Sequence, residues 1–417
     1  MNHDPLAEFL RNDAIARFLR YVQVDTRSDD ASEACPSTPG QRDLGRLLAG
    51  ELVEMGLDPV ELDADGYVYV TVPASAGAVG PAITFCAHMD TSPSESGAGV
   101  RPVLHENYPG GPIRFVDNPD LVLTPEMSPE LLRFLGDTII TASGETLLGA
   151  DDKAGLAAIM TALAALCRFA DLPRPELRVV FTPDEEIGRG ADHIDIKRLG
   201  TYGYTVDGGV IGELEAECFD AHKVVLNFIG RNIHPGTAKG KMINAAAIAA
   251  RFVADLPERE TPEQTEGREG FWHLTELDGN EGRARAVMIL RDFDAAKNVV
   301  RIEALRRQVR DFQNSYPGLR IDMTATDQYR NMAEVLDRHP KVTAMAEKAM
   351  IAAGIDVIRK PIRGGTDGAR LSFMGMPCPN LFAGGLMFHS KTEWIPATAL
   401  EKSAETILHL CRLWAES

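Results

Sequence analysis

Two adjacent glutamates, Glu185 and Glu186, come shortly after a stretch that predicts a strand, Glu176 to Phe181. Its apolar and β-branched residues favour extended backbone, while Pro183 and Gly188 break regular structure on either side of the pair. Neighbouring residues of extended backbone point in opposite directions. One glutamate could therefore ligate a metal ion while the other faces a substrate as general base. An isolated pair is more often a solvated turn, because charged residues are mostly exposed.

Further polar side chains occupy the ends of other predicted elements and support the metal interpretation. An apolar run that suits a strand buried on both faces, Ala82 to Ala87, leads into His88 and Asp90. In this His-x-Asp pattern both side chains lie on one strand face, so the aspartate could accept the second imidazole N–H. The complete set comprises His88, Asp90, Asp151, Glu185, Glu186, Asp207 and His389.

The chemistry of this set favours hydrolysis at two metal ions. Imidazoles combined with carboxylates suit zinc, manganese or cobalt, and hydrolytic zinc sites keep a position open for water. There are more carboxylates than one ion needs, which indicates two ions bridged by a carboxylate and a hydroxide. Each motif alone has a commoner structural explanation, and the interpretation depends on their coincidence.

The order of predicted elements indicates an α/β fold in the first half of the chain. Strands alternate with helices up to the strand Tyr202 to Val206, and such folds place their sites at strand ends. Near residue 220 the pattern changes to strand, helix, strand, helix, strand, which could pack as one sheet with helices on one face. The predicted segments are His222–Ile229, Met242–Ala254, Ala286–Asp292, Ala295–Asn314 and Arg320–Thr326.

Composition excludes several classes of protein. The 417 residues carry a formal net charge of -18, which argues against nucleic-acid and anionic-membrane partners. The N-terminus lacks a basic region followed by an apolar one, and no apolar run approaches the ~20 residues of a membrane span. Six scattered cysteines without a CxxC pair are typical of free thiols in a reducing compartment. We therefore expect a cytoplasmic protein.

Six motifs, in order along nearly the whole chain, resemble one enzyme family. The family is the tripeptide aminopeptidase branch of the dizinc metallopeptidases, which also include glutamate carboxypeptidase and aminoacylase. The motifs are His88–Pro93, Leu148–Gly155, Phe181–Glu186, Thr205–Gly209, His234–Gly240 and Pro361–Gly368.

The resemblance implies a fold and two zinc ions per subunit. The fold would be a mixed-sheet α/β zinc-peptidase catalytic domain, residues 1–219 and 336–417, with an inserted smaller α+β lid domain of the dimerisation type, residues 220–335. One zinc would be held by His88, Asp151 and Asp207. The other would be held by Asp151, Glu186 and His389, with Asp151 bridging.

The resemblance also implies catalytic and binding roles. Asp90 would orient His88, and Glu185 would move a proton from the bridging water to the leaving amine. His234 in the lid would stabilise the tetrahedral oxyanion. The peptide carboxylate or backbone would be bound by Arg363, Arg291 and Asn232. The expected substrate is a tripeptide, and the expected assembly is a homodimer through the lid.

Other candidate residues are interpreted as structural. We expect Asp152 to be a helix N-terminal acid with local hydrogen bonds, Asp184 to be a loop carboxylate, and Asp367 to shape its glycine-rich loop. The histidines His222, His273 and His339 are expected at the surface or in packing.

The residues around the last proposed ligand depart from the family pattern. The segment Gly385 to Glu393 keeps His389 but changes its neighbours, so the exact substrate preference stays open. The alternative functions are a related dizinc dipeptidase, carboxypeptidase or N-acyl amino acid amidohydrolase, and a catalytically inactive metal- or peptide-binding protein.

Overall fold

The computed structural model describes residues 4–417 and divides into two compact units. The larger unit comprises the chain up to Ala216 together with residues 334–360 and 366–417, and the smaller comprises residues 217–333 and 361–365. The short segment 361–365 belongs to the smaller unit although the chain on both sides of it belongs to the larger. A short helix, α6 (Ala333–Leu336), begins at the last residue of the 217–333 segment.

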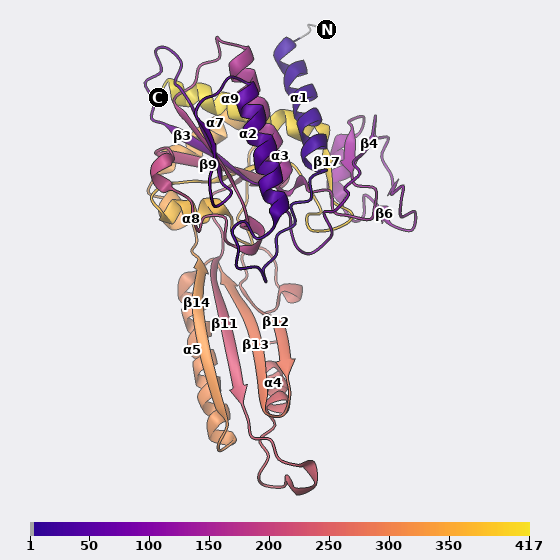
Figure 1. Ribbon diagram of the computed structural model, residues 1–417, viewed down its shortest axis with the longest axis vertical. Helices are drawn as coiled ribbons and strands as arrows, with labels where there is room; N and C mark the ends of the chain where they lie inside the picture. The colour runs from indigo at the N-terminus through magenta and orange to yellow at the C-terminus, as the bar shows by residue number, and fades with distance from the viewer. Residues whose placement is uncertain (1–3) are drawn as a thin grey trace. The chain divides into compact units, whose positions relative to one another are not determined.

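An eight-stranded mixed sheet forms the centre of the larger unit (Figure 1). In spatial order its strands are β1 (Val60–Leu62), β2 (Val68–Val72), β8 (Leu177–Thr182), β3 (Ile83–His88), β9 (Tyr202–Gly208), β16 (Asn380–Phe382), β10 (Glu213–Glu215) and β15 (Ile358–Arg359). The strands β8, β3, β9 and β16 run parallel to one another, while β1, β2 and β10 are antiparallel to a neighbour. The α/β prediction is therefore confirmed.

Helices cover both faces of this sheet. The long helices of the unit are α1 (Pro5–Tyr21), α2 (Pro39–Glu54), α3 (Ala150–Arg168), α7 (Pro340–Ala352) and α9 (Ala397–Ala415), and a shorter one is α8 (Asp367–Phe373). On one face, Tyr204 of β9 donates its hydroxyl to Val342 of α7 and accepts from the indole of Trp414 in α9. On the other face, Cys86 of β3 packs with Leu371 of α8. Alternate residues of each strand are thus buried on opposite sides, which explains the continuous apolar run in β3.

The part of the larger unit that shows no clear sequence pattern, Ser94 to Thr141, contributes most strands of two small sheets. One contains β17 (Trp394–Pro396), β7 (Ile139–Thr141) and β4 (Val103–His105), and the other contains β5 (Ile113–Arg114) and β6 (Val122–Leu123). The strands are two or three residues long, which is too short for an alternating pattern to be recognised in the sequence.

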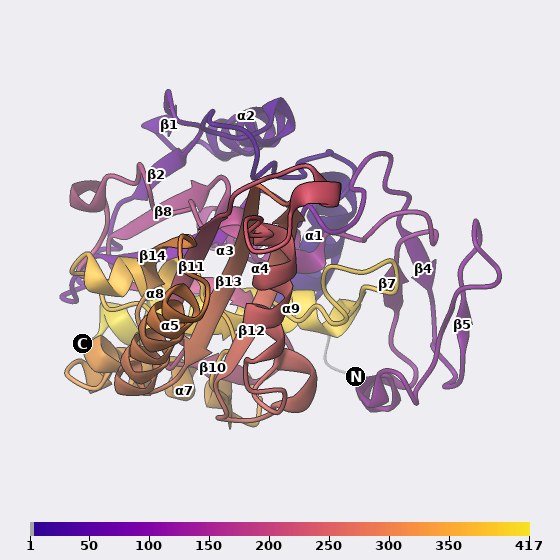
Figure 2. The same cartoon turned by 90° about the horizontal axis from the view of Figure 1, so that it is seen from below.

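The smaller unit is a four-stranded antiparallel sheet with two helices. Its strands, in spatial order, are β12 (Phe271–Gly279), β13 (Arg283–Asp292), β11 (Asp220–Ile229) and β14 (Arg320–Tyr329), and its helices are α4 (Ala245–Ala254) and α5 (Ala295–Ser315). Figure 2 views these strands and helices from below. The sequence pattern predicts only three of the strands. The fourth, β12, is an edge strand whose second half is polar and exposed, so it lacks the apolar alternation of a half-buried strand.

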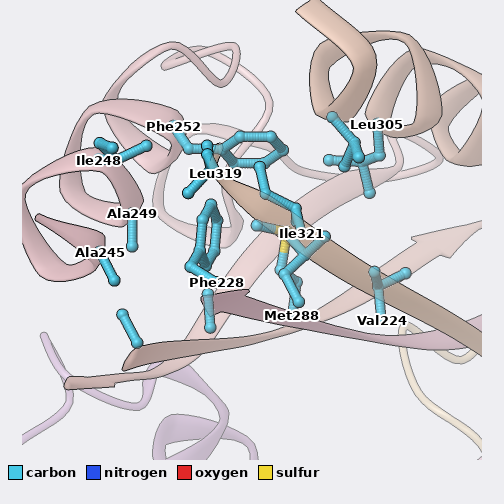
Figure 3. Close-up of a cluster of buried hydrophobic side chains, with 14 of the residues drawn as sticks. Val224, Phe228, Ala245, Ile248, Ala249, Phe252, Met288, Leu305, Leu319 and Ile321 are labelled. Carbon is cyan, nitrogen blue, oxygen red and sulfur yellow. The ribbon is translucent and has the colours of Figure 1, made fainter. Parts of the chain in front are cut away.

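Both helices of the smaller unit pack on the same face of its sheet. In β11 the buried side chains Val224 and Phe228 point to the same side as Met288 of β13. They meet Phe252 of α4 and Leu305 of α5 in one continuous hydrophobic core (Figure 3). Phe228 and Phe252 make an edge-to-face contact with ring centroids 5.4 Å apart, a geometry that aromatic pairs favour.

Among residues 4–417, no helix combines the length and the apolar character that crossing a membrane requires.

Candidate metal centre and catalytic site

Several polar residues of the candidate site lie at or just beyond the carboxyl ends of three adjacent parallel strands, β8, β3 and β9. His88 ends β3 and lies level with Thr182 of β8, so the glutamates after β8 come next to it. On the other side β3 pairs with β9, which carries Asp207. Because parallel strands bring their carboxyl ends to one edge, residues about 120 apart in sequence converge there.

Asp151 joins the two imidazoles of the candidate site. Its Oδ1 lies 2.9 Å from Nε2 of His88, and its Oδ2 lies 3.1 Å from Nε2 of His389. Asp151 stands at the start of α3, where its backbone is not helical (φ -86, ψ 107). The Asp151 carboxylate therefore contacts two separate imidazole nitrogens. A ligand that bridges two metal ions needs this arrangement.

Two more carboxylates flank this bridge. Oδ1 of Asp207 lies 3.5 Å from Nε2 of His88, and Oε2 of Glu186 lies 3.0 Å from Nε2 of His389. Among the described residues, two groups of three have ligand atoms within 4.8 Å of one another: His88 with Asp151 and Glu186, and His88 with Asp152 and Asp207. His389 is in neither group, although it contacts both Asp151 and Glu186.

Crowding of partly buried carboxylates makes the site favourable for cations. Burial raises the pKa of Glu186 to about 7 and that of Asp207 to about 7, and repulsion from Asp151 adds to both shifts. Burial lowers the pKa of the His389 imidazole, but hydrogen bonds to Asp151 and Glu186 outweigh it and raise that pKa to about 11. The other oxygen of Glu186, Oε1, is buried without a hydrogen-bond partner. Because imidazole and carboxylate donors are the ligands of zinc and related ions, the residues fit such a cation.

Asp90 ties His88 to the glutamate pair. Nδ1 of His88 lies 3.0 Å from the backbone oxygen of Asp90 and 3.4 Å from its Oδ1. The same carboxylate accepts the backbone N–H groups of Glu185 (2.9 Å) and Glu186 (3.1 Å). Nδ1 of His88 can donate to Asp90, so Nε2 is the ring nitrogen that can ligate a metal ion once it has lost its proton.

The glutamate pair has a backbone that differs from the expected one. Glu185 to Ile187 form a short 3₁₀ turn, η2, rather than extended chain. With three residues per turn, successive side chains still point in clearly different directions. His389 contacts Glu186, and burial raises the pKa of the Glu185 carboxyl well above its ordinary value. The two glutamate side chains therefore have different surroundings. The cause is the 3₁₀ turn, and not the extended backbone that the sequence predicted.

Asp184 is buried and structurally central, whereas the sequence indicates an ordinary loop carboxylate. It has a left-handed backbone (φ 58) and is fully buried. Its carboxylate accepts the backbone N–H of Ser37 at 2.7 Å, the Ser37 hydroxyl, and Nε2 of Gln41 at 2.7 Å. Oε1 of Gln41 accepts the backbone N–H of Asp184 at 3.0 Å. This cluster anchors the turn that carries Glu185.

We expect Asp184→Asn to lower the free energy of unfolding by about 1–3 kcal/mol, because the buried N–H and hydroxyl donors lose a charged acceptor. Asparagine tolerates the left-handed backbone, so the local chain path is kept. Chemical denaturation measures the change. The exposed Glu33→Gln is the control and should stay within about 0.5 kcal/mol of the native chain; an equal loss in both variants would contradict a special role for Asp184.

Asp152 and Asp367 have more partners than their sequence interpretation implies. Asp152 accepts the N–H of Gly155 at 3.1 Å, the expected local bond, but also the N–H of His88 at 3.2 Å. Both of its oxygens are thus engaged by backbone. Asp367, at the start of α8, accepts the hydroxyl of Thr182 at 2.7 Å and is buried, so it packs against β8 and not only within its own loop.

The candidate substrate-binding residues belong to the smaller unit and are described within it. His234 is exposed, and its Nδ1 accepts the N–H of Gly236 at 3.2 Å. The neutral ring therefore carries its proton on Nε2. Asn232 is exposed as well. Arg291 is buried and donates to the backbone oxygen of Leu290 (3.0 Å) and to Gln328 (2.9 Å).

The guanidinium of Arg363 has several partners inside the smaller unit. Its terminal nitrogens donate to the backbone oxygens of Gly267 (2.9 Å), Glu269 (2.8 Å) and Thr265 (3.2 Å) and to the Thr265 hydroxyl (3.0 Å). It also lies against the ring of Phe219, with 5.2 Å to the centroid. A substrate carboxylate bound by both terminal nitrogens would have to replace these acceptors.

The expected structural histidines are engaged with neighbours. His222 lies 3.0 Å from Asp220 and 3.0 Å from Asp327, while the ring of His273 packs against Phe271 and that of His339 against Tyr202.

Comparisons with known proteins agree with the motif resemblance. Residues 148–413 match the model of peptidase family M20/M25/M40. A protein named Peptidase T from Desulfitobacterium hafniense (strain Y51) is 48% identical over 403 residues, covering 96% of this chain and 98% of that protein. Another Peptidase T, from Geobacillus sp. (strain WCH70), is 45% identical over 408 residues, covering 98% of this chain and 100% of that protein.

Solved structures show the same fold. The aminopeptidase PepT from Bacillus cereus superposes with a TM-score of 0.74 at 22% identity, covering 97% of this chain and 99% of that one. A tripeptidase from Staphylococcus aureus gives a TM-score of 0.77 at 20% identity, covering 97% and 98%. The resemblance predicted from the six motifs is thus confirmed along nearly the full length, and the chain belongs to peptidase family M20/M25/M40, as a hydrolytic aminopeptidase of that family.

Proposed function

We propose that this protein is a dizinc aminopeptidase that removes the N-terminal residue of tripeptides. The observation that carries the proposal is the position of Asp151, whose two oxygens lie within 3.1 Å of two different imidazole nitrogens. The names of the relatives support the substrate class, since the full-length relatives are called Peptidase T and one structural neighbour is described as a tripeptidase.

We assign one zinc to His88, Asp151 and Asp207, and the other to Asp151, Glu186 and His389. The contacts of His389 with Asp151 and Glu186, and of His88 with Asp151 and Asp207, support this division. When bound, the two zinc ions supply a water nucleophile at neutral pH and polarise the scissile carbonyl. We assign Asp152 no ligand role, since backbone N–H groups already occupy both of its oxygens.

Glu185 is the general base of the proposed reaction. It takes a proton from the attacking water and delivers it to the departing amine of the second residue. Asp90 places it, because the Asp90 carboxylate accepts the backbone N–H of Glu185 while holding Nδ1 of His88. The carboxylate of Glu185 can accept a proton without loss of a metal ligand, since Glu186 carries the contact to His389.

Nearly all of the proposed lid, residues 220–335, belongs to the smaller unit. Its His234 presents a protonated Nε2 that can donate to the developing oxyanion, and Arg363, Arg291 and Asn232 bind the peptide carboxylate or backbone. We further propose a homodimer formed through this lid, which sedimentation equilibrium would test. A cytosolic location is supported by the six cysteines, all of which are free.

A kinetic panel of di-, tri- and tetrapeptides and N-acyl amino acids tests the substrate class. The expected result is the highest kcat/KM for tripeptides with a free amino terminus. Equal rates for all peptide lengths, or faster cleavage of N-acyl amino acids, would contradict it.

We expect His234→Ala to lower kcat by about 10²–10³-fold, the usual effect of losing one oxyanion donor. Zinc content, measured by elemental analysis, should not change, because His234 is not assigned as a ligand. His273→Ala, in the same unit, is the control and should keep its activity. Loss of zinc from the His234 variant would show that its assignment is wrong.

A further inference from the structure

Glu393 is a buried carboxylate that the proposed chemistry does not use. It is 1% exposed, and it accepts three backbone N–H groups from residues at and just before the start of α3. Its Oε2 lies 2.8 Å from the nitrogen of Leu148 and 2.8 Å from that of Gly149, and its Oε1 lies 3.1 Å from that of Asp151. The last of these belongs to the residue that joins the two imidazoles.

These N–H groups need an acceptor from elsewhere in the chain. The first N–H groups of a helix have no intrahelical partners, and the residue at the cap position, Gly149, has no side chain to offer one. After Ala150, the residues Asp151 and Asp152 have non-helical backbone. A carboxylate is the favoured partner at such a helix start, because backbone dipoles and N–H groups point toward it. Glu393 therefore supplies a cap from 242 residues beyond Asp151.

The same glutamate closes the loop that carries His389. Leu386 and Trp394 exchange backbone hydrogen bonds of 2.9 and 3.1 Å, which join the two ends of the loop. Inside it, the hydroxyl of Ser390 donates to the backbone oxygen of Met387 at 2.7 Å. The backbone N–H of Glu393 donates to the backbone oxygen of Ser390 at 3.2 Å. His389 is thus held in a small closed loop with Glu393 at its base.

We infer that Glu393 is a positioning residue that sets the distance between Asp151 and His389. It thereby sets the geometry of the metal position assigned to Asp151, Glu186 and His389. The inference rests on the proposed two-ion site. Its physical basis is a direct connection: one side chain from the His389 loop holds the backbone of Asp151. Outer partners of this kind change metal affinity because they decide where the ligands stand before the ion arrives.

The test is metal binding by Glu393→Gln. Glutamine keeps the shape but offers one oxygen, and its amide N–H₂ faces the N–H donors. The metal-free variant is titrated with zinc in a calorimeter. One ion should bind about 10–100-fold more weakly than to the native chain, the usual effect of losing a residue that holds a metal ligand in place. The absorption spectrum of cobalt-substituted protein should change for the same ion. Glu393→Asp, which keeps the carboxylate on a shorter side chain, should recover part of the affinity.

The matched control is Glu51→Gln. Glu51 is 8% exposed and accepts the Tyr21 hydroxyl at 2.6 Å, in a buried cluster with Arg17 of α1. This variant also loses a buried charge, but it should bind both ions with native affinity even if its thermal stability falls. If Glu393→Gln binds both ions as the native chain does, or if both variants lose affinity equally, the inference is overturned.

Amide hydrogen exchange gives an answer that does not depend on the glutamine variant folding. In Glu393→Asp the amides of Leu148, Gly149 and Asp151 should exchange faster than in the native chain, while those of α9 are unchanged. Unchanged exchange at all three amides would overturn the inference. Failure of the proposed function looks different: the native chain itself would then bind fewer than two ions or show no preference for tripeptides.

Discussion

Glu185→Gln is expected to lower kcat for a tripeptide by about 10²–10⁴-fold, the range that a positioned general base contributes. The variant should still bind two zinc ions, because Glu186, and not Glu185, contacts His389. Burial raises the pKa of the Glu185 carboxyl well above its ordinary value, which makes the carboxylate a stronger base. Glutamine has the same size but cannot accept a proton.

Steady-state kinetics combined with elemental analysis measures this prediction. Glu185→Asp is the matched variant, since it keeps a base but moves it by one methylene, and it should retain more activity than Glu185→Gln. Native kcat in the glutamine variant would remove Glu185 from the mechanism. Loss of zinc together with loss of activity would instead make Glu185 a ligand.

Asp151→Ala is expected to have the largest effect on metal binding. Because Asp151 faces both His88 and His389, its loss weakens both ion positions at once. Activity should fall by more than about 10²-fold, beyond the 10–100-fold typical of losing an outer partner. Zinc titration should show that neither ion binds with native affinity.

The neighbouring residue provides the control for this prediction. Asp152→Asn changes an adjacent buried carboxylate, yet both oxygens of Asp152 are bonded to backbone N–H groups, so this variant should still bind two ions. The opposite result is informative, because His88, Asp152 and Asp207 also form a compact group. Zinc loss in Asp152→Asn with retention in Asp151→Ala would assign the metal to that group.

Local patterns predict most regular elements of the fold, with errors where tertiary contacts extend or reshape them. The glutamate pair lies on a 3₁₀ turn and not on extended chain. β12 is not predicted, because this edge strand with polar residues is stabilised by pairing with β13. The spacing of apolar residues in the sequence gives no sign of that pairing.

What the sequence determined by itself is the family, the α/β class and a list of residues capable of metal chemistry. Side-chain types, strand patterns and the order of six motifs are local properties, so they can be read without coordinates. Only the tertiary structure decided which of these residues meet and what holds them. Asp151 lies between His88 and His389 because separate strands and a helix start converge, and Glu393 and Asp184 find their partners across 242 and 147 residues. Hydrogen bonds over such separations leave no periodic trace in the chain, and the free energy of burying a charged group is what makes them necessary.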